Sequence, residues 1–548
     1  MLLPRGVPTL LGLAQAVLAR AAAAIRLANR DPFVLVAWLC ALLAVRAMLH
    51  QAPAPLSSFD EALLFLNAQL MRDGQVIYRD FYCIYPPGLF QLIRALTALG
   101  LPEIWTMRAL TCLVHIASAV LSGRIVARTR NAFSGSNPRA ICWTTTACVL
   151  ALQTGIGCIP YAYWYAILWL QVILLAWPKP SDPRWRFWLC GGLIGVLSYV
   201  RHDVAVYAIG ALGVVEALGW AARRRSSYFG SMKEALQLLG SAAATVFVLW
   251  GPVFARAGFS RVLHDLVIDV SRYALPARVL PMPPLNTEIH VAPLNMTLPV
   301  FMGGGTEFCV VLSALALLSG VLFAGRVLLV KTPLNRERRL VLLVVPCALA
   351  TVPQALGRSD YAHLAFVLPM TLAAGGWLWN FGWARFFALF FAVLPWFSAY
   401  PTFLDWAGLK HFWNNSENSA FMTADEALVA DYLRRHTAPG EPIYVGCASH
   451  ERLSFAPLSP YYWGHRPGAT RYMQLDPGLA TTTEGQAAMV HDLERTRPAL
   501  LLRITGCWWA EPNTSALPGA TLLDEYLAAH YAPTESVSFY AVWTRKPR

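Results

Sequence analysis

The chain has 548 residues, of which 56% are hydrophobic and only 14% are charged. This composition excludes a soluble globular protein, since apolar runs of about 20 residues are typical of a polytopic membrane protein. The net charge of +13 does not indicate nucleic acid as a partner, because the cations gather in short segments between apolar runs.

Apolar runs of suitable length predict about eleven membrane-spanning helices. Residues 1–32 precede them, and arginines at positions 20 and 26 favour an amphipathic helix on the inner surface over a signal peptide. Residues 89–100 are predicted to form a juxtamembrane helix. The spanning runs are centred on 33–49, 104–126, 140–158, 161–177, 186–200, 204–222, 236–255, 308–330, 340–356, 363–379 and 384–400.

The distribution of cations predicts the orientation in the membrane. Counted from a cytoplasmic N-terminus, every inner segment is rich in Lys and Arg and nearly free of acids. These inner segments are 5–30, 124–139, 179–186, 223–233 and 326–339. The outer side then receives the loops 51–103 and 257–307 and everything after about residue 405. We therefore expect a protein of the bacterial inner or plasma membrane with its C-terminus outside.

The chain after residue 404 has a different character from the membrane module predicted over 33–404. Helix-like and strand-like pieces alternate, which predicts a small extracytoplasmic α/β domain over 405–548. These pieces are Glu426–Arg435, Pro442–Gly446, Gln486–Thr496, Ala499–Ile504, Leu522–His530 and Val537–Thr544.

Two smaller patterns concern the outer side. The three Asn-x-Ser/Thr sites, at Asn295, Asn414 and Asn513, all fall in predicted outer segments. The eleven cysteines show no metal-ligand spacing, and Cys447 and Cys507 lie on expected strands of the tail, where they could pair.

The first outer loop contains carboxylates and aromatic residues that a simple connection between two helices does not need. Asp60 and Glu61 open a helical pattern after the first span, and Asp80 lies in the aromatic segment Tyr78–Tyr82. Tyr85 then precedes Pro86-Pro87-Gly88. An interfacial helix with an aromatic belt is the simpler alternative, but it explains the aromatic residues and not the carboxylates.

Three predicted outer turns combine a cation and an anion within a few residues. Local ion pairing at helix ends is the alternative for any one turn, and Asp203 could equally cap a helix. Three such turns on one side favour a shared polar cavity, because ionisable groups at span ends usually face a cavity. The turns are Arg79-Asp80, Arg201-His202-Asp203 and Arg358-Ser359-Asp360 with His363, and the 257–307 loop adds Arg272 and Tyr273.

Carboxylates and arginines together suit a reaction with a lipid phosphate leaving group. Arg binds phosphate in a bidentate manner, and a carboxylate base can take the proton of an acceptor hydroxyl. We expect Arg358, with Arg201, Arg272 and His363, to bind the donor phosphate, although Arg272 could instead bind lipid headgroups. No nucleotide-binding motif is present, so no nucleotide cofactor is expected.

The residues of the first loop resemble a known superfamily. Asp60-Glu61 followed by GQVIYRDFYCIYPPG is similar to the first outer loop of the GT-C integral-membrane glycosyltransferases, which include the protein O-mannosyltransferases and the lipid A aminoarabinose transferases. The stretch 357–364 resembles a later outer turn of the bacterial members. The resemblance implies sugar transfer from a polyprenyl-phosphate donor with inversion, with Asp60 as the base. Asp80 sits differently from the aminoarabinose transferase pattern.

The predicted function is therefore transfer of a sugar from a polyprenyl-phosphate donor to a cell-envelope glycan, lipid or protein at the outer face. Glu61 and Asp80 are expected to support Asp60, and a divalent metal, if bound, would use Asp60 or Asp80. A transporter or flippase of lipid-linked sugars is the main alternative, and it would be expected to show paired repeats and charges near mid-membrane. A phosphotransferase or ligase using the same donors and a purely structural or receptor role are further alternatives. Other cavity candidates are Arg79, Tyr85, His202, Asp203, Tyr273 and Asp360.

Overall fold

The computed structural model describes most of the chain between residues 32 and 547. The described ranges are 32–130, 138–154, 157–178, 182–221, 232–277, 279, 288–291, 296–299, 306–329, 336–376, 378–398, 417–451, 456–476, 478–504 and 519–547. The expected N-terminal amphipathic helix, the three Asn-x-Ser/Thr sites and Cys507 lie outside the described residues.

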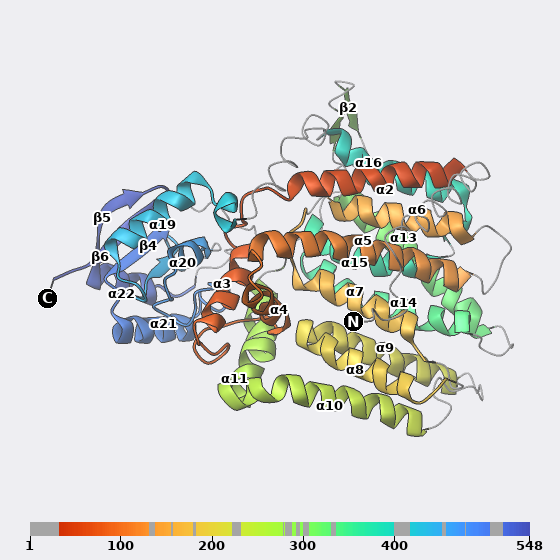
Figure 1. Cartoon of the computed structure of the whole chain (residues 1–548), viewed down its shortest axis with the longest axis horizontal. Helices are drawn as coiled ribbons and strands as arrows, with labels where there is room; N and C mark the ends of the chain where they lie inside the picture. Colours follow the sequence, from red (N-terminus) through yellow and green to blue (C-terminus); the bar gives the residue numbers. More distant parts are fainter. Residues whose placement is uncertain are drawn as a thin grey trace, which may run out of the picture.

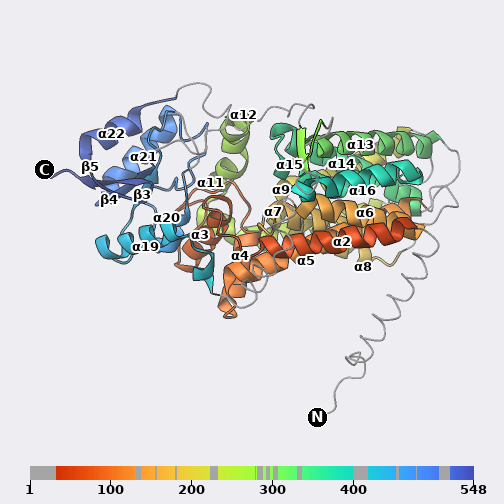
Figure 2. The same cartoon turned by 90° about the horizontal axis from the view of Figure 1, so that it is seen from above.

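Each of the predicted spanning runs contains a helix. The helices are α2 (Pro32–Gln51), α5 (Glu103–Arg130), α6 (Pro138–Gln153), α7 (Ala162–Ala176), α8 (Trp185–Val200), α9 (His202–Ala221), α10 (Met232–Ala257), α13 (Thr306–Leu329), α14 (Arg336–Gly357), α15 (Tyr361–Ala374) and α16 (Gly382–Ser398). They lie side by side as a bundle, as Figures 1 and 2 show from two directions. In a bilayer a helix satisfies all of its backbone hydrogen bonds within itself, which is why apolar runs fold this way.

Five helices among the described residues are long and apolar enough to cross a membrane. They cover Val34–Gln51, Glu103–Thr129, Lys233–Ala257, Cys309–Leu329 and Glu337–Gly357. Several others are apolar but shorter, for example α7 and α15. Large apolar side chains remain exposed on the bundle, such as Phe247 at 78% and Leu329 at 82%. The chain is therefore an integral membrane protein whose bundle presents apolar surface to lipid.

The first loop folds into two helices between the bundle and the C-terminal part (Figure 1). Helix α3 (Asp60–Arg72) is buried along most of its length and ends before Gly74, where a backbone φ of +91° suits glycine. Helix α4 (Gly88–Ala98) follows Pro86-Pro87 and agrees with the predicted juxtamembrane helix. Gly88 packs directly against the end of α8, since a Cβ there would lie 2.4 Å from the Tyr199 carbonyl oxygen.

The segment after α10 begins as a helix rather than as an irregular loop. It runs through α11 (Phe259–Leu263), the π-helical turns η2 (His264–Ile268) and η3 (Val270–Ala274), and α12 (Leu275–Ala277). Further on, β1 (Glu288–Val291) and β2 (Met296–Pro299) form an antiparallel hairpin. Helices α11 and α12 lie beside α3 and the C-terminal part, as Figure 2 shows.

The C-terminal part contains a four-stranded sheet with helices around it. The strand order is β3-β4-β6-β5, with β3 and β4 parallel and the other pairs antiparallel. The predicted strand over Val537–Thr544 is wrong in its bounds, because Val537 ends one strand and a turn at Ser538 (φ +53°) leads into the next. The short helix α20 was not predicted. The elements are α19 (Ala424–His436), β3 (Tyr444–Gly446), α20 (Ser459–Gly464), α21 (Thr483–Thr496), β4 (Leu500–Ile504), α22 (Leu522–His530), β5 (Tyr531–Val537) and β6 (Tyr540–Arg545).

One arginine of the C-terminal part connects it to both the first loop and the segment after α10. The Arg471 guanidinium donates to the Tyr78 carbonyl oxygen at 2.7 Å and to the Asp265 carboxylate at 2.8 Å. It also lies over the rings of Tyr82 and Tyr472. Asp265 is 1% exposed, and this burial raises its pKa to about 6 even though Arg471 acts in the opposite direction. This contact is therefore charged and largely desolvated.

Candidate active site

Asp60 opens helix α3, and its carboxylate is held by a residue of a distant helix. The Tyr161 hydroxyl, directly before α7, donates to Asp60 Oδ2 at 2.8 Å. Ser57 Oγ accepts a hydrogen bond from the Asp60 backbone N–H at 3.2 Å. The phenol therefore orients the carboxylate of Asp60.

An aromatic cluster connects Tyr161 to helix α15. The Phe366 ring lies 5.2 Å from the ring of Tyr161, 5.3 Å from that of Tyr163 and 5.4 Å from that of His363, measured between centroids. Tyr161 and His363 meet Phe366 edge to face, a favoured arrangement of aromatic rings. This packing brings the starts of α7 and α15 together beside Asp60.

Arg201 lies at the junction of α8 and α9 against the same aromatic residues. Its guanidinium carbon is 5.2 Å from the ring centroid of Tyr163 and 5.7 Å from that of Tyr85, within the range of a cation–π contact. It also forms a two-pronged ion pair with Asp203, at 2.9 Å and 2.7 Å. The Tyr78 hydroxyl donates to the Tyr85 carbonyl oxygen at 2.8 Å, which fixes this end of the first loop.

The turn before α15 supplies a second set of charges. Asp360 caps the helix by accepting the His363 backbone N–H at 2.9 Å, and its carboxylate also contacts His363 Nδ1 at 2.8 Å. Arg358 Nε lies 3.5 Å from the Asp360 carboxylate, a looser pair than that of Arg201. The Asp360 carboxylate also lies near the Tyr161 hydroxyl.

The structure therefore brings together groups from four separate segments of the sequence. We call this set the outer charged cluster. It consists of Asp60, Tyr85, Tyr161, Arg201, Asp203, Arg358, Asp360 and His363. In such a set the carboxylate of Asp60 can accept a proton, and the guanidinium groups of Arg201 and Arg358 can bind an anionic oxygen.

Glu61 has a different environment from its neighbour Asp60. It is 1% exposed and forms two hydrogen bonds with Arg108 of α5, Nε to Oε1 at 2.8 Å and Nη2 to Oε2 at 2.6 Å. Arg108 also donates to the carbonyl oxygens of Ala52, Ala54 and Pro55. This network fixes the loop before α3, and the supporting role of Glu61 toward Asp60 stays a prediction.

Asp80 and Arg79 pair with each other on the outside of the first loop. The Arg79 guanidinium donates to both carboxylate oxygens at 2.9 Å, and this hydrogen bonding lowers the pKa of Asp80. Asp80 also accepts the Val76 backbone N–H at 2.7 Å. These contacts hold the turn, and none of them runs to Asp60.

The remaining sequence candidates are Arg272, Tyr273 and His202. Arg272 lies over the ring of its neighbour Tyr273, whose hydroxyl donates to Glu484 of α21 at 3.4 Å. Their contacts therefore run to the C-terminal part. His202 begins α9, and its Nδ1 is buried without a hydrogen-bond partner among the described residues. The described residues contain no group of three His, Cys, Asp or Glu side chains placed to hold a metal ion.

Several residues that position the outer charged cluster were not identified from the sequence. Tyr161, Tyr163 and Phe366 lie within apolar runs and read there as ordinary lipid-facing or core residues. The aromatic residues concentrated at the start of α7, directly after Pro160, were the available signal. Arg108 is a lone cation five residues into a span, and such a residue usually has a partner.

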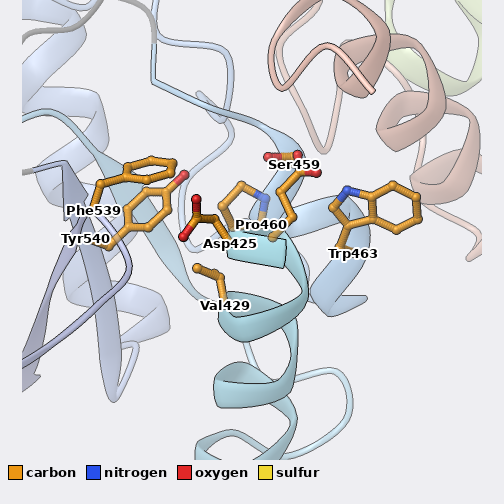
Figure 3. Close-up of a pocket in the computed structure, with 8 residues that line it drawn as sticks. Asp425, Val429, Ser459, Pro460, Trp463, Phe539 and Tyr540 are labelled. Carbon is orange, nitrogen blue, oxygen red and sulfur yellow. The ribbon is translucent and has the colours of Figure 1, made fainter. Parts of the chain in front are cut away.

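A cavity and an open cleft among the described residues lie away from the outer charged cluster. A small cavity of about 10 Å³ lies between α19, α20 and the turn from β5 to β6. Asp425 and Tyr540 are among its lining residues, which are drawn in Figure 3. It has room for about one water molecule. An open cleft of about 370 Å³ lies between the end of α3 and one face of α4, lined by Arg72, Gln91 and Arg94.

Comparison with known proteins found solved structures of low similarity to this chain. No family model matches the sequence, and no curated protein matches it. The archaeal oligosaccharyltransferase AglB from Archaeoglobus fulgidus, solved with an inhibitory peptide and a dolichol-phosphate, is 13% identical with a TM-score of 0.47 over 95% of this chain and 75% of that chain. ArnT from Cupriavidus metallidurans, solved with undecaprenyl phosphate, is 13% identical with a TM-score of 0.46 over 94% and 98% of the two chains. The structure of ArnT in its apo state has a TM-score of 0.48 and 13% identity, over 95% of this chain and 100% of that chain.

Proposed function

We propose that the chain is a membrane glycosyltransferase of the GT-C type, which transfers a sugar from a polyprenyl-phosphate donor to a cell-envelope glycan, lipid or protein. The observation that carries this proposal is the Asp60 carboxylate, held by Tyr161, whose aromatic neighbours connect it to Arg201 and to the turn of Arg358. A sugar transfer from a lipid phosphate needs both a base and a phosphate ligand, and the cluster offers both.

Asp60 is the proposed base. It takes the proton of the acceptor hydroxyl as the oxygen attacks the sugar carbon, and the bond from that carbon to the phosphate oxygen breaks. The lipid phosphate leaves with the electron pair of that bond, so the sugar carbon is inverted. The Tyr161 hydroxyl donates a hydrogen bond to the carboxylate and orients it before the attack.

Arg358 is the proposed first ligand of the donor phosphate. Arg201 makes a close two-pronged pair with Asp203, whereas Arg358 is 3.5 Å from a carboxylate that His363 also engages. The longer contact of Arg358 with its carboxylate favours it as the group that a phosphate engages first. Arg201 then contributes its charge from its place against the rings of Tyr85 and Tyr163, and His363 adds a ring nitrogen to the site.

The proposed orientation places the outer charged cluster and the C-terminal part outside the cytoplasm, with the N-terminus inside. The membrane is the bacterial inner or plasma membrane, and the C-terminal part is an extracytoplasmic α/β domain. The cation-rich segments at the opposite ends of the spans support this orientation.

Substitution of Asp60 tests the proposal. Asp60→Asn keeps the shape and one hydrogen-bond acceptor but removes the basic oxygen, so sugar transfer should fall by about 100-fold or more while donor binding survives. Asp80→Asn is the matched control, because Asp80 is a carboxylate of the same loop without a contact to the cluster. Transfer and binding of a polyprenyl-phosphate donor are measured on both variants in detergent. Near-normal transfer by Asp60→Asn would remove it as the base and favour the transporter alternative.

A further inference from the structure

Two buried cysteines from separate segments meet beside the outer charged cluster. Cys112 lies on α5 and Cys158 in the connection that leads into α7, and both are almost fully buried. Their Sγ atoms are 2.9 Å apart. A disulfide bond measures about 2.05 Å, so the two sulfurs need to move together by less than about 1 Å.

The backbone around Cys158 is fixed on two sides, so this pair is held in place. Its Sγ contacts the Met48 carbonyl oxygen of α2 at 3.3 Å. The preceding residue, Gly157, adopts a φ of +71°, and a Cβ there would meet the Gln51 side chain at 2.7 Å. Cys112 in turn sits on a helix whose first turns hold the loop before α3 through Arg108. Small side-chain rotations suffice to bring the sulfurs into bonding range.

The pair lies toward the end of the bundle that carries the C-terminal part. Cys112 is nine residues from Glu103, or about 13 Å along the helix axis. Glu103 accepts a hydrogen bond from Tyr462 of α20 at 2.6 Å. In the proposed orientation this end faces the oxidising side of the membrane, where disulfides form and persist. This one step rests on the proposed function and its topology.

We propose that Cys112 and Cys158 form a disulfide in the mature protein. Each thiol loses one proton and one electron, and a bond forms between the two sulfurs. The oxidant is the disulfide of a thiol oxidoreductase, which accepts the two electrons and two protons and becomes a dithiol. Once the bundle has closed, burial of both sulfurs keeps reductants away from the bond.

The bond ties α5 to the connection that positions the catalytic carboxylate. Cys158 is three residues before Tyr161, whose hydroxyl donates to Asp60. A cross-link that spans 46 positions in the sequence restricts this connection far more than local turns do. Cys112 and Cys158 are therefore positioning residues for Tyr161.

Mass spectrometry of the full-length wild-type protein tests the cross-link without any variant. The protein is purified in detergent under non-reducing conditions, unfolded, and treated with N-ethylmaleimide before digestion. We expect one linked peptide pair that contains Cys112 and Cys158, unlabelled until a reductant is added. Cys190 is the internal control, since it is buried with no neighbouring thiol contact among the described residues, and it should be labelled at once. Full labelling of Cys112 and Cys158 without reduction would overturn the proposal.

Hydrogen exchange tests the positioning role. In Cys112→Ala, Cys158→Ala and the double variant, amides of 157–161 should exchange about tenfold faster than in the wild type, and to the same extent in all three. Cys190→Ala should leave this segment unchanged. Additive effects of the two single substitutions would show that each sulfur acts only by packing. Reporter fusions test the topology separately. If the cross-link is found and the fusions place the C-terminus in the cytoplasm, the proposed topology is refuted and the disulfide stands.

Discussion

Removal of the Glu61 carboxylate should unfold the loop before α3 rather than stop the chemistry. The Glu61 and Arg108 side chains are 1% and 3% exposed, and two hydrogen bonds of 2.6 Å and 2.8 Å join them. In Glu61→Ala the Arg108 guanidinium stays buried without its counter-ion. Loss of one partner of a buried ion pair costs about 3–5 kcal/mol. We therefore expect a large fall in the free energy of unfolding.

The measurement is unfolding by titration with sodium dodecyl sulfate, followed by circular dichroism, with the transfer rate normalised to folded protein. Asp80→Asn is the control, because its pair with Arg79 is largely exposed and its loss should not change stability measurably. The double variant Glu61→Leu/Arg108→Leu should recover part of the loss, since it removes the unpaired charge.

Two results would contradict this reasoning. Equal stability of Glu61→Ala and Asp80→Asn would show that water reaches Arg108 and that the pair is not desolvated. A stable Glu61→Ala protein whose folded molecules have lost transfer would instead place Glu61 in the chemistry beside Asp60.

Three further predictions follow from particular contacts. Arg358→Ala should weaken binding of the polyprenyl-phosphate donor about tenfold to a hundredfold and leave the fold intact. Arg358→Lys should restore donor binding only in part. Unchanged donor binding in Arg358→Ala would remove Arg358 from the site. Gly88→Ala places a methyl group against the end of α8 and should lower the free energy of unfolding of the protein by about 1–3 kcal/mol. The control Gly240→Ala, in an open part of α10, should be neutral or slightly stabilising. Equal stabilities of the two variants would refute the close contact at Gly88. Burial raises the pKa of Asp265 to about 6, above an unfolded value near 3.9, so the folded state binds the additional proton and stability falls as the pH rises from about 4 to 6. Limited proteolysis of the contact with Arg471 should thus be faster at pH 7 than at pH 4.5, and this difference should vanish in Asp265→Asn.

The sequence by itself determined the helices of the bundle and one part of the site. Apolar runs must satisfy their backbone hydrogen bonds internally in lipid, so each predicted run contains a helix. The turn at Arg358, Asp360 and His363 could also be read locally, because Asp360 caps the helix that contains His363. The turn at Arg201 and Asp203 is local for the same reason, since its two charged groups are two residues apart.

Only the tertiary structure decided which of two adjacent acids faces the other groups. Asp60 and Glu61 point about 100° apart on a helix, and their neighbours in the sequence do not distinguish them. Glu61 is directed inward by Arg108, 47 positions away, and Asp60 is held by Tyr161, 101 positions away. A buried guanidinium is too costly to leave unpaired, so packing of α5 against the first loop assigns Glu61 to it. Such assignments depend on which distant helices pack together, and no local pattern of residues carries that information.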